Sequence, residues 1–268
     1  MKTNRAFTLV ELLVVVAIIA ILALLVSVAA GSFQKKAQIA QSIASLKQLS
    51  TGLLNYVAAH DGELPKLGAS QPGWGAASDK ERDAWYHAIP KASGARGLGE
   101  YDRPDAFYNK TNPLFLPIAT YPKNKASRPY FAVAINADLF GNAEARQNSE
   151  NAPAVRLANL QMPTATIVFL EVGLPDEDTL PGQTAGSYTG SAQGGPESVV
   201  ARYNKAGTSK RIEDRRDETI NLVFGDGHVD TMPAKDIIDS TGKAYYPQLQ
   251  QYNGLGKVSW TADPEAQP

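Results

Sequence analysis

The stretch that decides the fold is "RAFTLVELLVVVAIIAILALLVSVAA", residues 5–30. Residues 12–30 carry no charge, and as a helix they would be about 28 Å long at about 1.5 Å per residue. That length matches the hydrocarbon core of a bilayer, about 30 Å thick. The stretch predicts one transmembrane helix, residues 7–30, and Lys2 and Arg5 before it favour a cytoplasmic N-terminus with the rest of the chain exported.

A single carboxylate, Glu11, lies at the start of this apolar run. A carboxylate inside a membrane span costs roughly 2.5–3.5 kcal/mol, so it needs a partner. Arg5 lies about one and a half helical turns upstream, whereas cleavage between Ala6 and Phe7 would create an α-amino group about one turn from Glu11. In a helical array, Glu11 of one subunit could neutralise the Phe7 amine of its neighbour. We therefore interpret Glu11 as an assembly residue.

Two other interpretations of the N-terminal segment are a secretory signal peptide and a plain signal-anchor helix. A signal peptide has an apolar core of about 7–15 residues, shorter than the one here. A plain anchor has no use for Glu11, so it remains only as the alternative.

The residues "AFTLVELLVVVAIIAIL" resemble the class III signal of type IV pilins and of type II secretion pseudopilins. The resemblance implies that a membrane-embedded prepilin peptidase removes a leader, residues 1–6, by cutting between Ala6 and Phe7. It further implies N-methylation of Phe7 and an assembly role for Glu11. The family usually has glycine where this chain has Ala6, and alanine is similarly small.

The same resemblance implies a location and a set of partners. The chain would be a single-pass protein of the bacterial inner membrane, with its C-terminal domain on the periplasmic side, and would enter a filament after processing. Its partners would be membrane lipid, prepilin peptidase, the inner-membrane secretion and assembly machinery, and further copies of itself in a helical filament.

Residues 31–60 continue the helix with an amphipathic pattern. The apolar side chains recur every three or four residues, as one face of a helix requires. This stripe comprises Ile39, Ile43, Leu46, Leu49, Leu53 and Tyr56. "HDGELP", residues 60–65, should end the helix, because Asp-Gly favours a turn and proline blocks continuation.

Residues 61–268 are expected to form an exported globular α+β domain. Strands are predicted at residues 129–137, 165–173 and 219–232, and a short helix at 80–89. Residues 66–128 should contain long loops, and residues 175–198 should form a solvent-facing loop. The overall expectation is a pilin-like fold in which a long N-terminal helix, transmembrane below and amphipathic above, packs on an antiparallel β-sheet.

Gly225, Asp226 and Gly227 lie between two β-rich runs and predict a hairpin turn. The surrounding "RDETINLVFGDGHV" resembles a group of bacterial pilin-like proteins with a histidine, nine residues and then Asp-Gly. Here Arg216 stands where that group has histidine, so the resemblance bears on fold and relationship and carries no histidine chemistry.

No enzyme is predicted from this sequence. The chain lacks cysteine, its three histidines show no metal-ligand spacing, and no catalytic triad or carboxylate pair is evident. Because 26 basic residues nearly balance 27 acidic ones, nucleic acid is not an expected partner. Asp176, Asp178 and Asp226 are candidate calcium ligands, but acidic loop residues are usually solvated, so we expect no cofactor.

These observations favour a structural subunit of a type IV pilus-like filament, and within that class a pseudopilin of a type II secretion system. A surface pilus for adhesion, motility or DNA uptake is the alternative in the same class. A membrane-anchored binding module is the alternative from another class, with Trp74, Trp85, Tyr86 and Tyr101 as candidate sugar-stacking residues.

Overall fold

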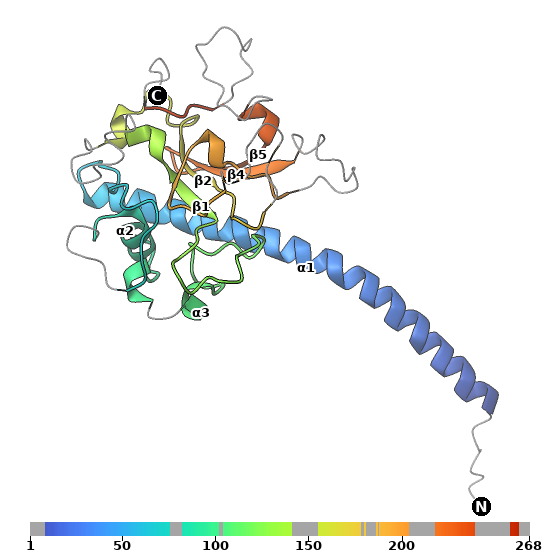
Figure 1. Cartoon of the computed structure of the whole chain (residues 1–268). Helices are drawn as coiled ribbons and strands as arrows, with labels where there is room; N and C mark the ends of the chain where they lie inside the picture. Colours follow the sequence, from blue (N-terminus) through green and yellow to red (C-terminus); the bar gives the residue numbers. More distant parts are fainter. Residues whose placement is uncertain are drawn as a thin grey trace, which may run out of the picture.

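A computed structural model of the chain shows a long helix that projects from a globular domain (Figure 1). The structure describes residues 9–75, 82–101, 104–140, 155–177, 180, 186, 188–203, 218–238 and 258–262, without the side chains of residues 25–32. The helix, α1 (Leu9–Ala59), has 51 residues and is therefore about 76 Å long at about 1.5 Å per residue. This agrees with the predicted continuous helix of roughly 50 residues.

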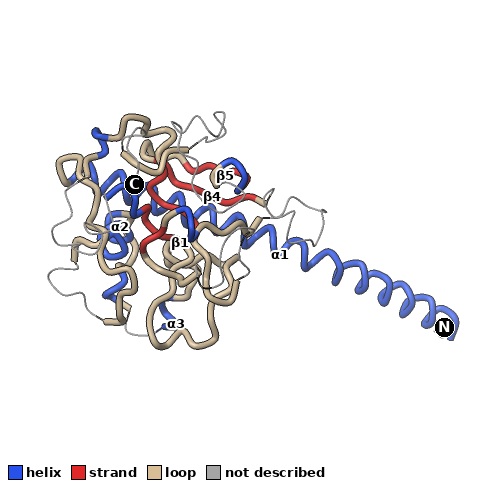
Figure 2. Tube along the Cα trace, turned by 45° about the horizontal axis from the view of Figure 1, so that its top comes forward, coloured by secondary structure: helices blue, strands red, loops and turns tan. Residues whose placement is uncertain are grey.

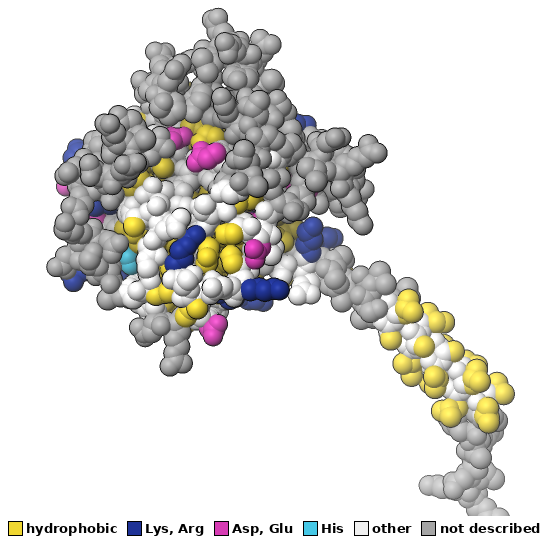
Figure 3. Space-filling model, viewed as in Figure 1, with side chains coloured by type: hydrophobic (Ala, Val, Ile, Leu, Met, Phe, Trp, Pro, Cys, Tyr) yellow, Lys and Arg dark blue, Asp and Glu magenta, His cyan; other side chains and the backbone are white. Residues whose placement is uncertain are grey.

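The lower part of α1 stands clear of the domain (Figure 1), and exposed apolar side chains lie along the face seen in Figure 3. From Leu9, which is 79% exposed, to Leu24, which is 67% exposed, none of these side chains is buried. Within the described residues, no helix has the length and apolarity that a membrane span requires. The predicted span extends into residues 25–30, whose side chains lie outside this description.

The upper part of α1 is held in the domain by the predicted stripe. Leu46, Leu49 and Leu53 are fully buried, and Tyr56 is 9% exposed. The helix ends where the sequence indicated, since Asp61 and Gly62 both adopt positive φ and the Gly62 N–H donates to the Val57 carbonyl at 3.0 Å.

Five strands form one sheet in the order β3-β1-β2-β4-β5. Their bounds are β1 (Val133–Asn136), β2 (Ile167–Glu171), β3 (Gln193–Gly194), β4 (Thr219–Phe224) and β5 (Val229–Pro233). β1, β2 and β4 lie inside the predicted strand segments, β5 runs one residue past the last of them to Pro233, and β3 lies in none. β4 and β5 form the predicted hairpin, whose antiparallel register pairs Asn221 with Thr231.

The expectation of a wholly antiparallel sheet was wrong, because β1 and β3 pair in parallel. β3 comes from residues 175–198, which we expected to be a solvent-facing loop. In its described part Tyr188 and Ala192 are buried, and the Tyr188 hydroxyl donates to the Val199 carbonyl at 2.6 Å. The glycine-rich composition here serves close packing: a Cβ on Gly194 would lie 2.7 Å from Val172.

Two short helices lie in the long segment between α1 and the sheet (Figure 2). They are α2 (Trp85–Ala92) and α3 (Pro104–Phe107). α2 starts later than the predicted 80–89, because Lys66 forms a parallel bridge to Ala84 that keeps the chain extended there. In that bridge the Trp85 N–H donates to the Lys66 carbonyl at 2.9 Å.

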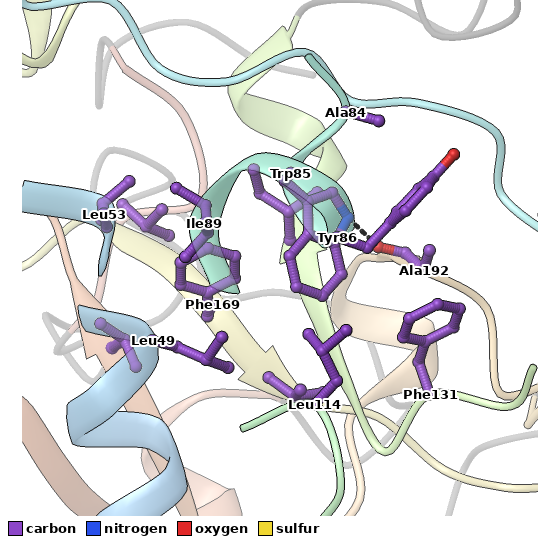
Figure 4. Packing of buried hydrophobic residues seen from close by; sticks show 14 of the residues in the cluster. Leu49, Leu53, Ala84, Trp85, Tyr86, Ile89, Leu114, Phe131, Phe169 and Ala192 are labelled. Carbon is purple, nitrogen blue, oxygen red and sulfur yellow. Dashed lines mark hydrogen bonds between the residues drawn. The ribbon is translucent and has the colours of Figure 1, made fainter. Parts of the chain in front are cut away.

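The main hydrophobic core fills the space between α1, α2 and one face of the sheet (Figure 4). Trp85 on α2 lies at its centre, 5.2 Å from Phe169 of β2 between ring centroids. The Trp85 indole N–H donates to the Ala192 carbonyl at 2.9 Å, so its polar atom is satisfied while its ring is fully buried. A second apolar cluster, which includes Leu222 and Trp260, covers the other face.

This packing predicts that the stripe on α1 holds the domain together. Leu53→Ala should lower the free energy of unfolding by about 2–5 kcal/mol, since it opens a cavity beside a fully buried side chain. Thr51→Ala, on the exposed face of the same turn, should change it by less than about 0.5 kcal/mol. Urea unfolding of the detergent-solubilised full chain measures both, and equal losses would contradict this role.

Candidate assembly site

Glu11 lies in the first turn of α1, exposed, with apolar side chains around it. Its neighbours Val10 and Leu12 are 69% and 59% exposed. A carboxylate near a helix N-terminus is favoured by the partial positive charge there. Ala6 and Phe7, the expected cleavage positions, lie outside the described residues. Glu11 thus lies in the first turn of the helix whose N-terminal part projects from the globular domain (Figure 1).

The turn between β4 and β5 fixes the sheet to α1. The Ser50 hydroxyl donates to the Gly227 carbonyl. Gly227 has φ +88, and a Cβ on it would lie 2.7 Å from Leu54 of α1. Gly225 faces the other way, where a Cβ would lie 2.5 Å from Leu160. Both glycines are required for close approach, and only Gly227 uses positive φ.

Asp226 and His228 are paired at the tip of this turn. The Asp226 Oδ1 lies 2.6 Å from His228 Nδ1 and accepts the His228 backbone N–H at 3.0 Å. Burial acts to raise the pKa of Asp226, but these bonds outweigh it and hold the pKa below its ordinary value. The His228 ring stacks on Phe224 at 4.4 Å. The Asp226 carboxylate is therefore already engaged in the turn.

The three calcium candidates are not gathered into one site by the described residues. Asp176 is exposed, Asp226 bonds His228, and Asp178 lies outside the description. In the described part of the chain, no three histidine or acidic side chains are placed to hold a metal ion.

A buried group of charges, which was not predicted from the sequence, surrounds Arg202. Arg202 joins Glu177 through two bonds, Nε to Oε1 at 2.9 Å and Nη2 to Oε2 at 2.6 Å. Its Nη1 lies 3.7 Å from the Oε2 of Glu171, a fully buried residue of β2. The other oxygen of Glu171 accepts bonds from Tyr203 and Asn221. Together these residues tie the segment after β3 to the middle of the sheet.

The two carboxylates of this group differ in pKa. Burial opposes ionisation of Glu177, yet the Arg202 charge and its hydrogen bonds keep the Glu177 pKa below its ordinary value. Burial raises the pKa of Glu171 to about 7, against the opposing pull of Arg202, Tyr203 and Asn221. The physical reason is that Glu177 already neutralises Arg202, so a second buried charge would be uncompensated. The available signal was the carboxylate inside the apolar run "TIVFLEV".

The aromatic residues considered for sugar stacking are largely inside the protein. Trp85 and Tyr86 are fully buried, Tyr101 is 4% exposed, and Trp74 is partly buried against the core. Their rings are therefore core packing, and the described structure gives the sugar-binding interpretation no exposed aromatic platform among these four.

Comparison with known proteins identifies one family feature. Residues 1–27 match the family described as "Prokaryotic N-terminal methylation motif". No characterised protein and no solved structure shows a significant match to the chain. The motif supports a type IV pilin-like class for this chain, that is, a prepilin peptidase substrate that forms filaments. The long helix and the mixed sheet are consistent with that class.

The close approach of the turn to α1 makes Gly227 sensitive to substitution. Gly227→Ala should cost more than Gly62→Ala, since both have positive φ but a Cβ on Gly62 would meet nothing within 4 Å. We expect about 1 kcal/mol for Gly62→Ala and about 2–3 kcal/mol for Gly227→Ala, measured by urea unfolding. In a double variant, Leu54→Ala should remove part of the loss of stability caused by Gly227→Ala. If the losses in the two single variants simply add up in the double variant, the Gly227–Leu54 contact is refuted.

The raised pKa of Glu171 predicts a pH-dependent stability. Its folded pKa lies above the unfolded value, so its contribution is complete below about pH 4.5 and is lost as the pH rises through about 7. Between pH 5 and 8, the free energy of unfolding should fall by on the order of 3 kcal/mol more in the wild type than in Glu171→Gln. Glu177→Gln frees Arg202 to pair with Glu171, and should flatten the same dependence at lower overall stability. Identical pH profiles in all three proteins would contradict the assignment.

Proposed function

We propose that this chain is a pseudopilin of a type II secretion system, stored as a single-pass protein in the inner membrane and then drawn into a helical filament. The observation that carries the proposal is the methylation motif at residues 1–27 leading into a helix whose apolar side chains are exposed around Glu11. A rod of this kind is soluble only when another apolar phase covers it, either lipid or the same helices of neighbouring subunits.

Burial of the apolar side chains of the lower helix stabilises both the membrane-inserted subunit and the assembled filament. Each large apolar side chain that leaves water contributes about 1.5–3 kcal/mol, and this holds in lipid and in a helix bundle alike. Transfer from membrane to filament therefore changes apolar burial little. Glu11 then favours the filament over the membrane state. In the filament its carboxylate can pair with the processed N-terminus of a neighbouring subunit, and in lipid that amine is not present.

The globular domain has a structural part in this proposal. It is fixed by the buried stripe and the turn at Gly227 to the upper part of the same helix whose lower part forms the assembly rod. The proposal assigns the chain no catalytic chemistry and no metal. A surface pilus shares all of these features, and the lack of cysteine favours the pseudopilus, since it excludes the end-loop disulfide found in many pilins.

The first test is the mass and N-terminal sequence of the protein from native membranes. Processing between Ala6 and Phe7 should give a chain that begins at methylated Phe7, and deletion of prepilin peptidase should leave Met1 in place. A chain that keeps Met1 while the peptidase is active would overturn the proposal.

The second test concerns Glu11. Glu11→Ala should leave membrane insertion unchanged and lower the yield of sheared filaments by tenfold or more, because an unpaired terminal amine would be left in an apolar core. Asp105→Ala, which removes one exposed acid from the domain, is the matched control and should assemble normally. Wild-type filament yield from Glu11→Ala would show that Glu11 has no part in assembly.

A further inference from the structure

Two segments of the chain carry positive charges and no acidic residue. Residues 12–60 contain Lys35, Lys36 and Lys47, and residues 106–128 contain four further cations. These four are Lys110, Lys123, Lys125 and Arg128. In a chain whose 26 basic residues are outnumbered by 27 acidic ones, this separation is unexpected.

The structure brings the two segments together. The Gln41 side-chain amide on α1 donates to the Lys110 carbonyl at 3.2 Å, so the second segment lies against the helix just where it leaves the domain. Lys35, Lys36 and Lys110 are all exposed. Figure 3 shows lysine and arginine side chains near this exit of the helix, beside the apolar rod. We call Lys35, Lys36 and Lys110 the basic collar.

The collar lies at a defined height above the apolar segment. Lys35 and Lys36 follow residue 30 by five and six positions, or about 8–9 Å along a helix. The headgroup layer of a bilayer begins at the edge of the hydrocarbon core and is roughly 5–8 Å thick on each side. The Lys110 backbone, at the level of Gln41, lies about 16 Å above residue 30. It is therefore roughly one Debye length, about 10 Å at 0.1 M salt, from the headgroup layer.

The two lysines on α1 also oppose the orientation of the helix. Lys2 and Arg5 favour a cytoplasmic N-terminus, whereas Lys35 and Lys36 place an equal number of cations directly after the apolar segment. Cations on the exported side of the helix weaken the preference for a cytoplasmic N-terminus. A favourable interaction of Lys35 and Lys36 with the membrane surface would offset this loss.

Resting on the proposed function, we propose that the basic collar binds the phosphate groups of anionic lipids on the exported face of the membrane, and holds the subunit upright there before assembly. Lysine suits this role, because its ammonium is a flexible point charge with three donors for phosphate oxygens. A neighbouring copy is a poorer partner for Lys35 and Lys36, since its helix carries no acid anywhere in residues 12–60.

The test uses the full chain in lipid nanodiscs made from equal parts phosphatidylcholine and phosphatidylglycerol. Native mass spectrometry of the released protein counts the lipids that stay bound. For the wild type we expect retained phosphatidylglycerol to exceed phosphatidylcholine by about fivefold or more, in line with the usual gain per lysine at an anionic surface. Lys35→Gln/Lys36→Gln/Lys110→Gln should return the ratio to that of the bulk lipid.

The matched control is Lys66→Gln/Lys91→Gln/Lys235→Gln, which removes the same charge from exposed sites outside the collar. It should retain the wild-type enrichment. No enrichment in the wild type, or equal enrichment in both triple variants, would overturn the proposal. So would a collar variant that keeps its lipids but loses filament assembly, because the collar would then contact a neighbouring subunit.

Failure of the proposed function would look different. A wild-type protein that does not enter nanodiscs of either lipid alone would remove the membrane stage altogether. A protein that enters both but shows no preference would leave the filament proposal intact and refute only the collar.

Discussion

The structure depends on one constraint: a single continuous helix must be insoluble at one end and part of a soluble domain at the other. The change occurs along α1, between the exposed apolar side chains up to Leu24 and the fully buried Leu46. No break in the helix is needed, since a stripe three to four residues apart is enough to hold one face against the sheet. This stripe is the main apolar attachment of the domain to α1.

The turn at Gly225, Asp226 and Gly227 is the second half of the same attachment. It brings the β4–β5 hairpin within a hydrogen bond of Ser50, and the missing Cβ of Gly227 allows the close approach to Leu54 of α1. Asp226 is occupied with His228 in shaping this turn. The Asp226–Gly227 pair therefore has a structural explanation within the turn itself.

The buried charges have a different character from the exposed ones. Arg202 and Glu177 neutralise each other inside the domain, and burial raises the pKa of Glu171 to about 7, which disfavours a second buried charge there. Lys35, Lys36 and Lys110, by contrast, are exposed near the exit of α1, beyond the C-terminal end of its apolar segment. The buried charges around Arg202 stabilise the fold, whereas the exposed lysines are accessible to a binding partner.

The sequence by itself determined the long helix, its two zones and the motif at its start, because these follow from local periodicity and from the cost of a carboxylate in an apolar run. It also located β1, β2, β4 and β5 through their apolar and β-branched residues. Tertiary structure decided the parallel strand β3, the late start of α2 and the Glu171–Arg202–Glu177 group. Each of these depends on segments far apart in the chain, such as Lys66 against Ala84 or Arg202 against Glu171, and contacts of that kind leave no periodic signal in the sequence.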